Sequence, residues 1–143
     1  MKIKHLSISS KVPERSAAIL AELTSGEVKP FPSKTMENAW LCIWDEGENE
    51  LIEFIPNQYA LCYGVHAAVY ERQDKSQEFN ASHFMLEANK DINELARIAD
   101  KHGLVHRFRA RFGGPLYEVW LEDSLLVEFW SREIQNYTVN KNC

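Results

Sequence analysis

The chain has 143 residues, a formal net charge of −5 at pH 7 and a hydrophobic fraction of 45%. This length suits one compact domain, or two small halves that share a core. The negative charge disfavours nonspecific binding to nucleic acid or anionic lipid, and no apolar run approaches the roughly 20 residues of a membrane span. The irregular spacing of Cys42, Cys62 and Cys143 indicates neither a disulfide framework nor a cysteine-based zinc site. Residues 1–5 lack the apolar segment of a secretory signal. We therefore expect a cytoplasmic protein with no nucleic-acid or membrane partner.

The first half of the chain predicts a strand, a helix and further strands. Alternation over residues 3–9 indicates the first strand. Pro13 begins a helix in which Ala17, Leu20 and Leu23 recur at helical spacing, and the helix ends near Ser25–Gly26. Alternation then predicts strands over residues 39–45 and 50–55, joined by a turn, with a short additional strand over residues 31–36.

The second half predicts the same order of elements. A strand over residues 81–88 leads into a helix whose start carries a capping box of Asp91 and Glu94, and Gly103 ends the helix. Three strands follow, over residues 105–112, 116–121 and 125–130.

Each half carries one histidine in its first strand and one unexpected glutamate in its last. Glu128 lies among Leu126 and Trp130 on its face of the strand, and Glu53 has a similar apolar setting. An unpaired buried carboxylate costs several kcal/mol or more, so such a residue needs a metal, an arginine or a proton. His5 and His83 occupy matching places in the two halves, which indicates an internal repeat.

This repeat divides the single domain of residues 1–143 into a module of residues 1–56, a linker of residues 57–80 and a module of residues 81–143. Within the linker, residues 59–70 are apolar enough to form an extra strand or an interface segment. Residues 72–80 read as an exposed loop.

The matching stretches are Ile3–Ile8, Glu50–Phe54, Ser82–Leu86 and Leu126–Phe129. Together they resemble the vicinal oxygen chelate superfamily, which includes glyoxalase I, bleomycin-resistance proteins and extradiol dioxygenases. The resemblance implies an α+β fold: paired βαβββ modules form a half-open barrel, with helices on the convex side. It also implies a homodimer and a divalent metal ion such as nickel, cobalt, zinc or manganese. The implied metal ligands are His5, Glu53, His83 and Glu128.

The order His, Glu, His, Glu resembles glyoxalase I, which implies a lyase or isomerase acting on a small substrate with two neighbouring oxygens. Glu128 or Glu53 is then the base. The chain departs from the family pattern in two places. Leu121–Ser124 replaces the frequent Asp-Pro-Asp-Gly turn, and Ile19–Leu20 replaces a frequent Phe-Tyr pair.

The predicted metal ligands also have interpretations that involve no metal. The histidines can be hydrogen-bonded strand residues and the glutamates can face solvent or arginine. His66 is a rival to His83. The alternative function is a metal-free small-molecule binding protein of the bleomycin-resistance type. Its pocket, like that of the enzyme, would be lined by four tryptophans and one arginine: Trp40, Trp44, Trp120, Trp130 and Arg109.

The arginine stripe of the second half also has two interpretations. Arg107, Arg109 and Arg111 share one strand face and would suit an anionic substrate. Alternatively, reflection of the hairpin through Gly113–Gly114 places Arg109 opposite Glu118, as in an ordinary cross-strand ion pair.

Overall fold

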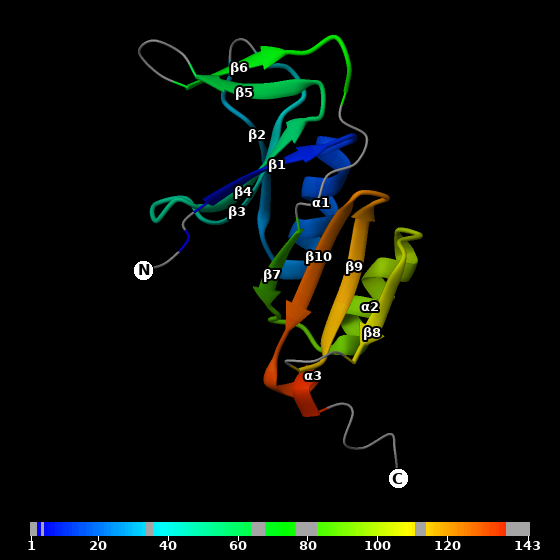
Figure 1. Cartoon of the computed structure of the whole chain (residues 1–143). Coiled ribbons are helices and arrows are strands. Elements are labelled where there is room, and N and C mark those ends of the chain that lie inside the picture. The colour runs from blue at the N-terminus through cyan, green and yellow to red at the C-terminus, as the bar shows by residue number, and fades with distance from the viewer. Residues whose placement is uncertain are drawn as a thin grey trace. The chain divides into compact units, whose positions relative to one another are not determined.

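The computed structural model describes residues 3, 5–33, 36–63, 68–76, 83–110 and 114–136 (Figure 1). The chain divides into two compact units. Unit 1 comprises Met1–Ala21 and Gly26–Asn80, and unit 2 comprises Glu22–Ser25 and Ala81–Cys143. Among the described helices, none has the length and apolar character needed to cross a membrane.

Unit 1 contains a four-stranded mixed sheet in the order β1-β4-β3-β2, in which β1 and β4 are parallel and the other pairs are antiparallel. Its elements are β1 (His5–Ser10), α1 (Pro13–Thr24), β2 (Glu27–Pro30), β3 (Trp40–Asp45) and β4 (Glu50–Pro56). Two further strands, β5 (Tyr59–Tyr63) and β6 (Ala68–Arg72), form a separate antiparallel pair. The linker thus contains two ordered strands.

Unit 2 repeats this plan in the order β7-β10-β9-β8, again with one parallel pair, β7 and β10. Its elements are β7 (His83–Glu87), α2 (Ile92–Lys101), β8 (His106–Arg109), β9 (Leu116–Glu122), β10 (Leu125–Trp130) and a short helix α3 (Arg132–Asn136) that the sequence pattern did not predict. The predicted α+β class with two βαβββ modules is confirmed, and both sheets are open.

One strand of unit 1 lies earlier in the chain than the sequence predicted. The additional strand was expected over residues 31–36, but β2 covers Glu27–Pro30 and pairs with β3. Pro30 and Pro32 lack the backbone N–H groups that a longer strand would need. Phe31 instead packs its side chain against Leu41, Ile43 and Leu51.

The end of α1 is formed by a left-handed residue that is not glycine. Ser25 has a φ of 59°, and the amide of Gly26 donates to the carbonyl of Ala21 at 3.0 Å, as in a Schellman motif. Gly26 serves a different purpose, because a Cβ atom there would lie 2.9 Å from Cys42 Sγ and 3.2 Å from the carbonyl oxygen of Ile43. Ser25 and Gly26 therefore form the whole connection between α1 and β2.

The core of unit 2 lies on one face of its sheet. Helix α2 begins at the predicted capping box, in which the Asp91 carboxylate accepts from the amides of Asn93 and Glu94. The buried residues of α2 are Ile92, Leu95, Ile98 and Ala99. On the strands, the buried face is formed by Phe84, Tyr117, Val119, Val127 and Phe129. The charged residues of β8, β9 and β10 therefore gather on the other face.

Candidate functional site

The predicted ligand pair of unit 1 lies on two neighbouring parallel strands. Ser7 is paired with Glu53 and His5 with Leu51, so the His5 and Glu53 side chains share one face, two residues apart in register. The Ser7 hydroxyl donates to one oxygen of the Glu53 carboxylate. The Nδ1 atom of His5 lies 2.9 Å from the side-chain amide of Asn49. Both predicted ligands thus have a polar neighbour that orients them.

The predicted pair of unit 2 has the same register. His83 is paired with Leu126 and Met85 with Glu128, so His83 and Glu128 again share a face two residues apart. His83 is exposed, whereas Glu128 is 8% exposed. Within the described residues, the Glu128 carboxylate takes part in no hydrogen bond or ion pair.

The two pairs offer the right donor types for a divalent ion. Two imidazoles and two carboxylates are a ligand set that borderline divalent metals accept. In the part of the chain that the structure describes, no three histidine, cysteine, aspartate or glutamate side chains are grouped closely enough to hold a metal. Each unit by itself supplies one imidazole and one carboxylate, so coordination by all four residues stays a prediction.

Ser7 and Asn49 were not among the predicted site residues. Ser7 was detectable in the sequence, because it follows His5 by two residues and so shares its strand face. Asn49 has a φ of 58° and lies in the turn before β4. Its contact with His5 depends on strand pairing, which the sequence alone does not show.

The tryptophans divide between the faces of the sheets. In unit 2, Trp120 is paired with Leu126 and Trp130 with Glu87, so both lie on the face of Glu128, and their role in lining a pocket stays a prediction. In unit 1 the prediction for Trp40 is wrong, because Trp40 is paired with Phe54 and therefore lies on the face opposite to Glu53. Leu41 and Ile43 occupy the Glu53 face instead.

Trp44 is also unsuited to the predicted pocket. The β3–β4 pairing is irregular between Ile43 and Asp45, and the indole nitrogen of Trp44 lies 3.3 Å from the position that a Cβ atom on Gly26 would occupy. Its ring is thus at the junction of α1 and β2.

Arg109 takes part in a compact charged cluster on β8 and β9. Arg109 Nη1 lies 2.6 Å from Glu118 Oε1, and Arg107 Nε lies 2.7 Å from Glu118 Oε2. The predicted pairing of arginine with Glu118 is confirmed, although the strand register places Arg107, rather than Arg109, directly opposite Glu118. Arg111 lies outside the described residues.

The environment of Glu118 keeps it ionised. Burial raises the pKa of its carboxyl group, but the hydrogen bonds and charges of Arg109 and Arg107 outweigh burial, and the pKa is lowered overall. Glu118 is also the direct cross-strand neighbour of Glu128. Two carboxylates in this relation repel each other, and the arginines compensate that repulsion.

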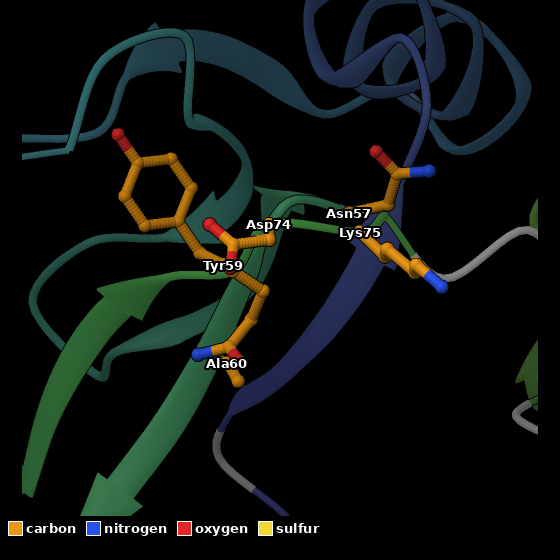
Figure 2. A pocket seen from close by; sticks show the side chains of 6 residues that line it. Asn57, Tyr59, Ala60, Asp74 and Lys75 are labelled. Carbon is orange, nitrogen blue, oxygen red and sulfur yellow. The ribbon is translucent and has the colours of Figure 1, made fainter.

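A cavity of about 430 Å³ lies beside the β5–β6 pair (Figure 2). Asn57 and Tyr59 contribute to its wall from the start of the hairpin, and Asp74 and Lys75 from the segment after β6. None of the predicted site residues lines this cavity. His66, the rival to His83, lies outside the described residues.

No protein-family model and no curated protein matches the sequence. Solved structures do match. The fosfomycin resistance protein FosX from Listeria monocytogenes, complexed with Mn(II) and 1S,2S-dihydroxypropylphosphonic acid, has a TM-score of 0.59 at 13% identity and covers 97% of this chain and 98% of its own. FosX from Mesorhizobium loti has a TM-score of 0.55 at 15% identity, covering 90% and 89%. The oxidase ChaP-H2 has a TM-score of 0.60 at 11% identity, covering 92% and 94%.

Identities this low establish the fold alone. They agree with the resemblance that the four sequence stretches indicate, and they extend over nearly the whole length of each protein. The chain therefore shares the fold of these proteins, built from two βαβββ modules.

Proposed function

We propose that the protein is a metal-dependent lyase or isomerase, similar to glyoxalase I, that acts on a small substrate with two neighbouring oxygens. The observation that carries this proposal is the repeated register of the His–Glu pairs. In each unit, an imidazole and a carboxylate lie on adjacent parallel strands, on one face and two positions apart. A structural salt bridge or a surface histidine would not require the same register twice.

In this proposal His5, Glu53, His83 and Glu128 coordinate one divalent ion, of nickel, cobalt, zinc or manganese. A bound divalent ion supplies Lewis acidity at the substrate oxygens. The structure of FosX from Listeria monocytogenes supports the choice of ion and of substrate, since it holds Mn(II) with a ligand that carries two neighbouring hydroxyl groups.

The protein's own contribution is to orient the ligands and to move a proton. The Ser7 hydroxyl donates a hydrogen bond to one carboxylate oxygen of Glu53, whereas the Glu128 carboxylate has no such donor in the described part of the chain. Glu128 is also mostly shielded from water. We therefore assign the role of base to Glu128, and the role of a fixed ligand to Glu53.

A metal-free binding protein is the second candidate. The observation that favours it is the face of unit 2 on which Trp120 and Trp130 accompany the charged cluster, since aromatic rings beside polar groups suit a small organic ligand. Such a protein would bind its ligand with no metal and no turnover.

Elemental analysis of protein purified without chelator tests the proposal directly. We expect about one transition-metal ion per complete site, lost in the His83→Ala and Glu128→Ala variants and retained in Glu133→Ala, which alters an exposed residue of α3. All three variants should keep the circular dichroism spectrum of the wild type.

Activity is measured separately, with methylglyoxal and a thiol in the presence of each ion. Metal without turnover would reject the proposed substrate and leave the metal centre standing. Absence of metal, together with no calorimetric binding of nickel, cobalt, zinc or manganese, would withdraw the catalytic roles of all four residues in favour of the binding protein.

A further inference from the structure

The cluster of Arg107, Arg109 and Glu118 is not used by the proposed metal chemistry. It lies on β8 and β9, on the face of the sheet that also carries Glu128. Helix α2 covers the other face, because the α2 residue Asp100 contacts His106, which precedes Arg107 and points the opposite way. On this face the two arginine side chains are about half exposed, whereas Glu118 and Glu128 beside them are buried.

Each arginine uses only one donor atom to contact Glu118. Arg107 donates through Nε and Arg109 through Nη1, and neither side chain has another hydrogen bond within the described residues. A guanidinium group carries five N–H donors, so most of the donors of each group remain available. Their side chains are 60% and 50% exposed, whereas the side chain of Glu118 is 1% exposed.

Glu118 and its direct cross-strand neighbour Glu128 bring two carboxyl groups to this face, and the two guanidinium groups match them in number. Two arginines fixed by one buried anchor form a preorganised fork, which loses less conformational entropy on binding an anion than free side chains would.

We propose that Arg107 and Arg109, held by Glu118, bind the oxyanion group of the substrate, with the uncharged part of that substrate extending across β9 towards Glu128, beside Trp120. Glu128 is the direct cross-strand neighbour of Glu118, and Trp120 lies on the same face, two residues after Glu118. Glu118 is a positioning residue in this arrangement. The inference rests on the proposed function for its substrate, which it restricts to small anionic molecules.

Anion binding is tested on the metal-free full-length chain. Isothermal calorimetry with inorganic phosphate, and separately with acetate, is carried out at constant ionic strength so that general charge screening is the same throughout. We expect saturable binding of at least one anion to the wild type. The tighter of the two indicates whether the substrate carries a phosphoryl or a carboxylate group.

The Arg107→Gln and Arg109→Gln variants should each weaken that binding roughly ten- to hundredfold, the effect of losing a charge-assisted hydrogen bond. Each variant leaves the other arginine on Glu118, so the buried carboxylate stays paired and the variant should remain folded, which circular dichroism checks. Arg97→Gln is the matched control, since Arg97 is an exposed residue of α2 on the other side of the sheet, and its affinity should equal that of the wild type.

Two results would overturn the inference: no saturable binding of either anion by the folded wild type, or equal affinities in the wild type and both arginine variants. Neither result depends on metal or turnover. A protein that binds metal but not phosphate or acetate loses only this inference, whereas one that binds an anion at the arginines but no metal loses only the proposed function.

Discussion

Glu118 determines how the charged side chains on one face of the unit 2 sheet are arranged. It is buried, and it is paired with Glu128 on β10. It also accepts hydrogen bonds from two arginines of β8, the neighbouring strand on its other side, and so orients them. Without it, the face would carry two loosely held cations and one buried carboxylate. The distribution of charge around the candidate base therefore depends on a residue that need not touch the substrate.

We expect Glu118→Gln to lower the free energy of unfolding at pH 7 by roughly 1–3 kcal/mol, because glutamine fills the space but cannot neutralise either guanidinium group. The pKa of Glu118 is lowered in the folded protein from its ordinary value of 4.5, so its stabilising contribution is complete above that value and is lost as the pH falls through the lowered pKa. Urea unfolding at a series of pH values measures this.

The difference between wild type and variant should therefore shrink as the pH drops below 4.5. The Glu133→Gln variant, altered at an exposed position, should stay within about 0.5 kcal/mol of the wild type at neutral pH. A stability difference that persisted unchanged into strong acid would mean that packing, and not charge, is what Glu118 provides.

At the scale of the elements, the junction of α1 and β2 separates two properties that glycine usually supplies together. Ser25 adopts the left-handed conformation, while Gly26 supplies the small size that lets the backbone approach Cys42 and Ile43. The last turn of α1 belongs to unit 2, within which Glu22 lies 2.8 Å from Lys101 and 2.7 Å from His102.

Opposite changes at these two neighbours should have opposite effects. Ser25→Gly should stabilise the protein by about 0.5 kcal/mol, since the removed cost of a positive φ exceeds the contribution of the exposed hydrogen bond that Lys90 Nζ donates to Ser25 Oγ. Gly26→Ala should destabilise it by about 1–3 kcal/mol, since the new methyl group would press on Cys42 Sγ and the backbone of β3. Thermal unfolding of the two variants side by side decides this. A stabilised Gly26→Ala variant would contradict the close approach.

Elements with a strong local signal were predictable from the sequence. The apolar run of residues 125–130 predicts β10, and the capping box at Asp91 predicts the start of α2, because both signals lie within a few residues of chain. The repeated His–Glu positions were predictable because each residue lies in a strand that the local pattern predicts. Strand β2 was misplaced, because its four residues contain no full alternation, it ends at Pro30, and Pro32 follows closely.

The faces of the strands required information that alternation does not contain. Alternation shows that Trp40 and Leu41 point to opposite sides, but only the pairing of β3 with β4 shows which of them accompanies Glu53. The arginine hairpin was wrong in register by two residues, yet its ion pairs were right, because long side chains also reach diagonal neighbours.

At the scale of the whole molecule, the similar solved structures cover nearly the entire chain at 15% identity or less. At such low identity the proteins share a fold, but the residues at their functional sites can differ. Metal content and anion binding are therefore questions about this chain's own residues.

We expect the protein to be a homodimer in solution, following the family resemblance of the sequence and the apolar stretch in residues 59–70. Within the described residues, Leu61 on β5 is 62% exposed and Val69 on β6 is 42% exposed. Light scattering at micromolar concentration should give twice the chain mass of 16.6 kDa. A mass of one chain over the whole accessible concentration range would reject the dimer.

The pairing of β1 with β4 and of β7 with β10 has a consequence for how the chain acquires its structure. In each four-stranded sheet the first strand to be synthesised pairs with the last strand of that sheet. The two hairpin pairings of each of these sheets close short loops, whereas the parallel pairing joins residues 46 positions apart in one sheet and 43 in the other, and carries the larger entropic cost. Because β10 lies between β7 and β9, unit 2 has no continuous sheet until residues 125–130 are in place. During synthesis the strand of His83 therefore stays unpaired until β10 has been made. We expect the β7–β10 pairing, which places His83 and Glu128 on one face, to be among the last pairings to form.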